Sequence, residues 1–294
     1  TERRMKRIAI IGSGISGIGA AYALKDTADV TLFEAQDRLG GHACTHVFDY
    51  DGHETAVDLG FIVYNGLNYP NLIGLFDALD VETQESDMSF AVSDRDGWEW
   101  ASTARGIFAQ KRNLFSLDFH RFWRTILKFN DLARAELAAG RIEDTTLGDW
   151  LDFHGFDQAF RCNYILPMGA AIWSTPEVGM LDYPARSFFQ FFENHRLMHK
   201  ERPQWRTVTG GSQSYVNAAA AELGDRVRTG TPAIRVFPFG DKITVVTEDN
   251  RSHIFDDVIL ATHSDQALRL VEKGFEDQSF LLRSVHYRPN TIYL

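Results

Sequence analysis

The feature that most restricts the fold of this chain is a glycine-rich turn between a short apolar run and a helical pattern. Residues 8–11 are all apolar, and Gly12, Gly14 and Gly17 follow directly. After the helical pattern, a second apolar run ends at Glu34. The order of strand, glycine turn, helix, strand and acid is that of a dinucleotide-binding unit. We therefore predict an α/β fold with a Rossmann-like nucleotide-binding domain.

Each residue type in this motif has a physical reason. Gly12 permits a tight turn, Gly14 lets the backbone approach a pyrophosphate, and Gly17 allows close packing of helix on strand. The N–H groups at the start of the helix form an anion site. Glu34 lies 22 positions after Gly12, near the spacing of roughly 20 expected for a carboxylate that binds ribose hydroxyls and would repel a 2′-phosphate. This stretch contributes to the predicted cofactor site Gly12, Gly14, Ile15, Ser16, Gly17 and Glu34.

Two other interpretations apply to the same stretch. GxGxxG patterns also occur in ordinary turns, but here the strand before, the helix after and the distant acid all agree. The basic cluster within residues 3–7, with an Ala-Tyr-Ala sequence at residues 21–23, has the outline of a secretory signal. The periodic glycines inside the apolar run and the position of Glu34 argue against a signal peptide.

The residues that follow Glu34 distinguish FAD from NAD. They read AQDRLGGHACT, which places Arg38 and the pair Gly40 and Gly41 shortly after the acid. Arg38 supplies a cation for a phosphate group, and a glycine pair lets the backbone pass close to an extended cofactor. A simple NAD dehydrogenase would not usually carry DRLGG at this point.

The order Glu34, Arg38, Gly40, Gly41 resembles the extended fingerprint of the FAD-binding superfamily of flavin amine oxidases, protoporphyrinogen oxidases and phytoene desaturases. It is most similar to a bacterial branch of amine oxidase-like proteins, through the stretches GGHACT, VDLGFIVYN, LPMGAAIWST, RPQWRTVTGGS and LATHSDQAL. The chain departs from the pattern at His42, where many relatives have arginine. The resemblance implies non-covalent FAD, and it adds to the cofactor site Ala35, Arg38, Gly40, Gly41, His42, Gly60, Phe61, Ile62, Ala233, Ala261 and Thr262.

Composition limits the remaining classes of function. The net charge of −10 disfavours a nucleic-acid partner. No uninterrupted apolar run approaches the ~18 residues of a membrane-spanning helix. The two cysteines, Cys44 and Cys162, are far apart and lack metal-ligand spacing, so we predict no metal site and a reducing, cytoplasmic location.

The strand patterns predict a discontinuous cofactor domain of residues 1–66 and 205–290. A mostly helical substrate domain, residues 67–204, is inserted between its two parts. The pair Asp51-Gly52 predicts a hairpin in the first part, and residues 88–102 predict another in the insertion. Residues 291–294 have the pattern of the start of a strand. The C-terminal portion usual in the superfamily is missing, so we expect the chain to be truncated.

Two polar residues stand before helical patterns in the position of an N-cap. Asn68 comes before Pro70, and Ser212 comes before the pattern that runs through Leu223. Ser and Asn are favoured at such positions because the side chain accepts a hydrogen bond from a backbone N–H group of the first turn. We therefore expect both side chains to cap their helices.

Residues 105–128 admit two interpretations. Phe119, Phe122, Trp123 and Ile126 have helical spacing, and basic residues fall on a different face. Such a helix can pack into a domain with its charges in solvent, which we favour. The alternative is peripheral contact with a membrane surface through residues 105–128.

Phenylalanine is abundant, at 22 residues, and four of the five residues 188–192 are phenylalanine. Such runs usually belong to a core, but their place between two cofactor-binding segments leaves a substrate cavity open. Together with the uncharged stretch LPMGAAIWS of residues 166–174, they favour an apolar substrate that is lipid, fatty-acyl or isoprenoid-like over a small polar amine.

These patterns predict an FAD-dependent oxidoreductase that removes a hydride from its substrate to flavin N5. A flavin amine oxidase acting on a C–N bond and a flavin-binding protein without turnover are the alternatives. The only catalytic candidates near the flavin ring are His42, Tyr64 and Asn65. For these, cofactor packing and strand-end hydrogen bonding are equally good explanations. The sequence does not predict the oligomeric state.

Overall fold

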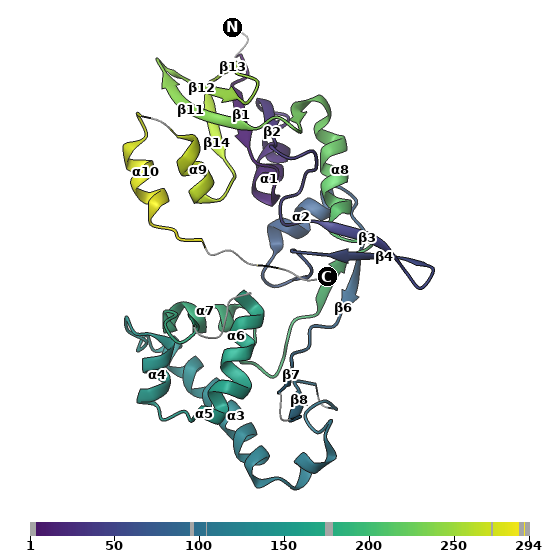
Figure 1. Cartoon of the computed structure of the whole chain (residues 1–294), viewed down its shortest axis with the longest axis vertical. Coiled ribbons are helices and arrows are strands. Elements are labelled where there is room, and N and C mark those ends of the chain that lie inside the picture. Colours follow the sequence, from purple (N-terminus) through teal and green to yellow (C-terminus); the bar gives the residue numbers. More distant parts are fainter. Residues whose placement is uncertain are drawn as a thin grey trace. The chain divides into compact units, whose positions relative to one another are not determined.

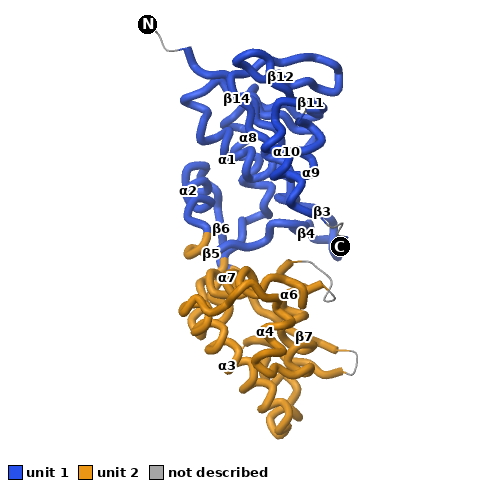
Figure 2. The backbone as a smooth tube through the Cα atoms, turned by 90° about the vertical axis from the view of Figure 1, so that its left-hand side faces the viewer, with its two compact units in different colours: residues 1–64, 69–85, 206–294 blue, residues 65–68, 86–205 orange. Residues whose placement is uncertain are grey.

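A computed structural model describes residues 4–94, 97–103, 105–173, 179–271, 273–287 and 291. The chain divides into two compact units (Figure 2). Unit 1 comprises residues 1–64, 69–85 and 206–294, and unit 2 comprises residues 65–68 and 86–205.

This division differs from the predicted boundaries. The sequence placed everything from residue 67 to residue 204 in the inserted domain, whereas residues 69–85 belong to unit 1. Their helix packs its apolar side chains, among them Phe76, into the core of unit 1, which the local pattern could not reveal. Of the strand predicted at residues 291–294, residues 292–294 lie outside the described residues.

The centre of unit 1 is a four-stranded sheet with the order β10-β2-β1-β14 (Figure 1). The central strand, β1, pairs in parallel with β2 on one side and with β14 on the other. The sheet therefore joins segments from both ends of the sequence, which confirms the predicted α/β class. The strands are β1 (Arg7–Ile11), β2 (Asp29–Phe33), β10 (Val227–Arg228) and β14 (Asp257–Leu260).

Alternate residues of β1 face two different layers, because successive side chains of a strand point to opposite faces. Ile8 and Ile10 pack in a cluster with side chains of helices α1 (Ile15–Leu24) and α8 (Gln213–Leu223). Ala9 and Ile11 pack in a second cluster with an antiparallel sheet. The apolar residues at positions 8–11 of β1 follow from burial on both faces.

The antiparallel layer of unit 1 has the strand order β11-β12-β13. Its strands are β11 (Ala233–Phe239), β12 (Lys242–Thr247) and β13 (Ser252–Phe255), and helices α9 (Ser264–Leu270) and α10 (Glu276–Arg283) follow in sequence.

The hairpin predicted around Asp51-Gly52 is present as β3 (Thr45–Tyr50) and β4 (His53–Asp58). Both turn residues have positive φ, of 54° and 81°, as the tight turns favoured in two-residue hairpins require. A further sheet has the order β5-β9-β6, with β5 (Tyr64–Asn65), β9 (Trp205–Val208) and β6 (Thr83–Ser86).

Neither predicted cap forms. Helix α2 (Pro70–Ala78) begins after Tyr69, without a side-chain cap, and Asn68 Nδ2 instead donates to the Asn194 carbonyl at 2.7 Å. Ser212 does precede α8, but its hydroxyl donates to Asp58 Oδ1 at 2.7 Å. In both cases a partner far away in sequence replaces the local backbone.

Unit 2 is mostly helical. Its hairpin, predicted for residues 88–102, consists of β7 (Ala91–Ser93) and β8 (Glu99–Ala101), while residues 95–96 of the turn lie outside the described residues. A 3₁₀ helix η1 (Lys111–Phe115) leads into α3 (Leu117–Ala138). The other helical segments are α4 (Leu147–Phe153), α5 (Gln158–Phe160), the π-helical η2 (Arg161–Ile165), α6 (Leu166–Trp173) and α7 (Ala185–Asn194).

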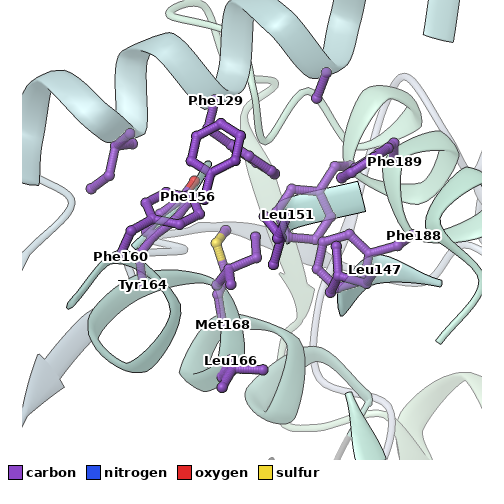
Figure 3. Close-up of a cluster of buried hydrophobic side chains, with 14 of the residues drawn as sticks. Phe129, Leu147, Leu151, Phe156, Phe160, Tyr164, Leu166, Met168, Phe188 and Phe189 are labelled. Carbon is purple, nitrogen blue, oxygen red and sulfur yellow. The ribbon is translucent and has the colours of Figure 1, made fainter. Parts of the chain in front are cut away.

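Aromatic side chains form the core of unit 2 (Figure 3). Phe129 of α3 is fully buried among Trp150, Phe156, Phe160 and other rings. The phenylalanine run of α7 points into the same core, and Phe188, Phe189 and Phe192 have no exposed area. These three side chains are therefore core residues of unit 2, not the walls of a cavity.

Candidate cofactor site

At the junction of β1 and α1, backbone contacts leave no room for a side chain at Gly12 or Gly17. Gly12 has a φ of +101°, and a Cβ on it would lie 2.8 Å from the carbonyl oxygen of Ala261. A Cβ on Gly17 would lie 1.8 Å from the carbonyl oxygen of Gly12. The Gly12 N–H donates to Phe33 O at 2.9 Å. Glycine at positions 12 and 17 therefore lets α1 start directly against β1 and β14.

Gly14 is in a different position, because a Cβ on it would meet no described atom within 4 Å. It immediately precedes α1, whose first turn carries no acidic residue. The first N–H groups of a helix lack intrahelical partners and favour an anion. The open space at Gly14 is therefore space in which a phosphate group can approach the backbone.

Glu34 is held in place by hydrogen bonds at the end of β2. Its Oε2 accepts from the N–H and the hydroxyl of Ser13, at 3.0 and 2.5 Å. Its Oε1 accepts from the Gln36 N–H at 2.8 Å. Ser13, which is almost fully buried, also receives the Gly40 N–H on its carbonyl at 3.1 Å. Sequence reasoning missed Ser13, although it stands between two glycines of the motif.

The loop from Arg38 to Ala43 wraps the same turn. Gly40 and Gly41 have φ of +112° and +57°, and a Cβ on Gly41 would lie 3.0 Å from the Cα of Gly14. The Arg38 guanidinium donates to Gly41 O at 2.9 Å and to Ala43 O at 3.4 Å. Arg38 thus clamps the loop in this structure, and its cation stands at the wall of the pocket described next.

These segments enclose a pocket of about 840 Å³ that is lined only by residues of unit 1. Most of the residues that the sequence assigned to a cofactor line its wall. They are Gly14, Ile15, Ser16, Glu34, Ala35, Arg38, Gly40, Gly41, His42, Phe61, Ala233, Ala261 and Thr262. Residues almost 250 positions apart are thus brought to one concave surface.

Four of the assigned residues do not line the pocket: Gly12, Gly17, Gly60 and Ile62. The two glycines of the turn act through packing. A Cβ on Gly60 would lie 2.3 Å from His42 O, so Gly60 lets the segment after β4 approach the Arg38–Ala43 loop rather than the pocket. Ile62 is 55% exposed and accepts a hydrogen bond on its carbonyl from Thr207 at 2.8 Å.

The three catalytic candidates lie in different surroundings. His42 lines the pocket, with its ring 5.4 Å from that of His263. Tyr64 is buried, with its ring 5.3 Å from that of Phe76. Asn65 is fully buried, and its Oδ1 accepts from the N–H groups of residues 67 and 68. Of the three, His42 is the one at the pocket.

The pocket contains further residues that sequence reasoning missed. Tyr69 and Leu72 come from the start of α2, Tyr215 comes from α8, and His263 and Gln266 come from the start of α9. Burial, with the nearby Asp58 carboxylate, raises the pKa of Tyr215 to about 12, so its phenol stays neutral at physiological pH. His263 and Gln266 closely follow Thr262, which the sequence had already assigned to the cofactor, so their position could have indicated them. Tyr69, Leu72 and Tyr215 reach the pocket only through packing.

A sequence profile described as flavin containing amine oxidoreductase matches residues 15–292. The chain belongs to this family. Among its relatives is a tryptophan 2-monooxygenase of Pseudomonas savastanoi, which is 26% identical over 95% of the chain and 56% of that protein. A flavin-containing amine oxidase of Oncorhynchus mykiss is 26% identical over 87% of the chain and 49% of that protein.

Two solved structures share the fold. A cyclohexylamine oxidase from Brevibacterium oxydans superposes with a TM-score of 0.73 at 21% identity, covering 95% of the chain and 63% of that protein. A wild-type putrescine oxidase gives 0.68 at 22% identity, over 92% and 61%. The chain thus spans roughly half to two thirds of the length of these relatives.

The cofactor of a flavin-containing amine oxidoreductase is FAD, and the pocket fits it. The open position at Gly14, at the start of α1, suits a pyrophosphate. Glu34 stands at the end of β2, where a carboxylate binds ribose hydroxyls. Phe61 and Tyr215 line the pocket besides the Arg38–Ala43 loop, and its volume of about 840 Å³ is far larger than a single phosphate group needs.

We predict that Ser13→Ala weakens FAD binding about tenfold. The change removes the hydroxyl that donates to Glu34 Oε2 and keeps the backbone donor. A hydrogen bond to a charged group contributes about 1.5–3 kcal/mol, of which we expect roughly half to appear as lost affinity. Titration of the apoprotein with FAD, followed by flavin fluorescence, measures the dissociation constant.

Glu34→Gln is the companion variant, because it removes the charge and keeps the shape of the side chain. We expect it to weaken FAD binding at least as much as Ser13→Ala. If Glu34→Gln weakens binding while Ser13→Ala leaves it unchanged, the hydroxyl does not orient the carboxylate.

Proposed function

We propose that this protein is an FAD-dependent oxidoreductase that oxidises the C–N bond of an amine or amino acid. The observation that carries the proposal is the family match over residues 15–292, combined with a pocket that fits FAD. The relatives named above are a tryptophan monooxygenase and oxidases of amines. Their names support a substrate of the amine class.

Oxidation of an amine in this way needs only the amine, FAD, water and dioxygen, and no further reacting group of the protein. When bound, FAD would supply a two-electron acceptor for the hydride on the carbon next to the substrate nitrogen. The nitrogen loses one proton to solvent, and the resulting imine adds water to yield a carbonyl compound and ammonia. Dioxygen would take up the two electrons together with the proton of the hydride and one proton from solvent, which gives hydrogen peroxide. The substrate enters as the neutral amine, because a protonated nitrogen cannot assist hydride loss.

In this proposal the residues of the chain orient the cofactor and enclose it. The N-terminus of α1 and the Arg38–Ala43 loop receive the pyrophosphate, and Glu34 receives the ribose hydroxyls. Tyr215, neutral at physiological pH, presents a phenol to the pocket. His42 stands at the pocket wall, with its ring 5.4 Å from that of His263. We assign no general base to any residue.

An amine replaces the apolar substrate that the sequence favoured. That expectation rested on the phenylalanine run and on the uncharged stretch before it. Phe188, Phe189 and Phe192 are fully buried against one another and their neighbours in unit 2. The run is therefore explained by core packing. The same fold also occurs in a fatty acid isomerase from P. acnes, with a TM-score of 0.59 at 16% identity, so the fold alone does not select a substrate.

Anaerobic reduction of the bound flavin tests the proposal. The FAD-loaded protein is mixed with cyclohexylamine, putrescine, L-tryptophan or a long-chain unsaturated fatty acid, and the visible absorbance of the flavin is recorded. We expect bleaching by at least one amine and none by the fatty acid. The formation of hydrogen peroxide after admission of air gives a second readout.

Two results would overturn this proposal. Bleaching by the fatty acid alone would restore the apolar substrate. Full FAD binding without bleaching by any amine, even though dithionite reduces the flavin, would favour a flavin-binding protein without turnover.

A further inference from the structure

Three large apolar side chains of unit 2 are exposed where η1 ends and α3 begins. Leu114 is 46% exposed, Phe115 is 88% exposed and Leu117 is 82% exposed. We call these three residues the apolar turn. Exposed single apolar residues are common on protein surfaces, but three of them within four positions form a local patch.

Hydrogen bonds hold the backbone of the apolar turn in place, so its side chains are not exposed because a helix end is frayed. Asn113, directly before Leu114, is buried, and its Nδ2 donates to Glu99 O at 3.3 Å. Ser116 caps α3, with its Oγ accepting from the Phe119 N–H at 3.2 Å. His120 Nε2 bonds Leu114 O at 2.8 Å. Polar residues before, within and after the apolar turn thus anchor its backbone, while its apolar side chains stay outside.

The apolar turn continues into a basic stripe. Arg121, Arg124 and Lys128 follow Leu117 at i+4, i+7 and i+11, which places all four on one face of α3. All three basic residues are exposed. Arg105, Lys111 and Arg112 precede the turn, and Asp118 is the one acidic residue between 105 and 128. This segment therefore carries six basic residues against one acidic residue, in a chain of net charge −10.

The apolar face that the sequence indicated for this helix is not part of the surface. Phe119, Phe122 and Ile126 are at most 7% exposed and belong to the core of unit 2. The preferred interpretation of a packed amphipathic helix is correct for these residues. The alternative, peripheral contact with a membrane surface through residues 105–128, therefore requires other side chains of this segment. The exposed apolar turn and the basic stripe are a different set of side chains.

We propose that the apolar turn and the basic stripe dock this protein on an anionic lipid surface. Protruding Phe and Leu side chains can enter the boundary between headgroups and acyl chains, while neighbouring basic residues attract the headgroups. A fluid bilayer accepts separate protruding side chains, whereas a protein partner must offer a matching pocket. Among the described residues no helix is long and apolar enough to cross a membrane.

Co-sedimentation with vesicles tests this docking. The full chain is mixed with vesicles of phosphatidylcholine alone, or of phosphatidylcholine with phosphatidylserine, at low and at high salt. We expect binding to the anionic vesicles at low salt, and release at high salt because salt screens the basic stripe. The double variant F115D/L117D should lower the partition coefficient at least about tenfold, and R121E/R124E should do the same.

Phe153→Asp is the matched control. Phe153 ends α4 and is 85% exposed, so the same substitution is made at a phenylalanine of equal exposure outside the apolar turn. We expect it to bind anionic vesicles like the wild type. Circular dichroism of each variant confirms that unit 2 remains folded.

The docking proposal is overturned if the wild type fails to sediment with anionic vesicles at low salt, or if Phe153→Asp loses binding as much as F115D/L117D. Light scattering supplies the other decisive result. A wild-type dimer that F115D/L117D converts to a monomer, without any vesicle binding, would assign the apolar turn to a second copy of the chain. None of these outcomes depends on flavin reduction, so docking and catalysis are tested separately.

Discussion

Gly17→Ala should abolish the binding of FAD, with an expected loss of affinity of at least about 100-fold. The added Cβ would lie 1.8 Å from Gly12 O and 3.3 Å from the Cβ of Ala261. The nearer atom, Gly12 O, belongs to the backbone and cannot move aside as a flexible side chain can. Helix α1 must therefore shift away from β1, and the site at its N-terminus opens. Overpacking of this kind also costs about 1–3 kcal/mol of stability.

Titration of the apoprotein with FAD measures the first effect, and chemical denaturation of unit 1 measures the second. Gly19→Ala is the matched control, since Gly19 lies two residues further along α1 and a Cβ there would meet nothing within 4 Å. We expect wild-type affinity for this variant and a gain of roughly 0.5–1 kcal/mol, because alanine is the better helix former. Wild-type affinity in Gly17→Ala would contradict the structural account of the turn.

Phe129→Ala should lower the stability of unit 2 by about 3–5 kcal/mol, the cost of replacing a buried phenylalanine with alanine. The Phe129 ring is fully buried, and its centroid lies 5.1 Å from that of Phe160 and 5.7 Å from that of Phe189 (Figure 3). A loss of this size is a large part of the 5–15 kcal/mol by which a typical domain is stable. We expect partial unfolding of unit 2 at moderate temperature.

Tryptophan fluorescence is a suitable probe for this variant, because all six tryptophans lie in unit 2. Denaturation followed by that signal reports unit 2, while bound FAD reports unit 1. Phe153→Ala is the control, and its exposed ring predicts a change within about 0.5 kcal/mol. Equal destabilisation by both substitutions would show that the ring cluster around Phe129 is not the core of unit 2.

Local patterns were sufficient to predict the strand, turn and helix at the start of the chain. Gly17 is required by a contact within this unit, because a Cβ on it would meet the carbonyl oxygen of Gly12, and Gly12 is required by the φ of +101° at the turn itself. The same holds for the hairpin at Asp51-Gly52, whose two positive φ angles are a property of the turn. The extended fingerprint through Gly41 also predicted the FAD family correctly, because its residues follow the cofactor along a continuous stretch.

Side chains that find partners far along the chain could not be predicted. Ser212 had the local features of a helix cap, yet its hydroxyl bonds Asp58, 154 positions away. Tyr215 had no feature that indicated a pocket residue, and it reaches the pocket because α8 packs against α1. A rule based on local sequence considers only partners within a few residues. The folded chain also offers partners that are distant in sequence.

The sequence by itself determined that this chain builds a dinucleotide-binding unit of the FAD type, because glycine geometry and the spacing to Glu34 act within a few dozen residues. The tertiary structure decided which apolar side chains are core and which are surface. Phe188 and Phe122 are buried, whereas Phe115 is 88% exposed, although all three are phenylalanines in helical segments. Burial depends on which elements pack against one another in three dimensions, and that information is distributed over the whole chain.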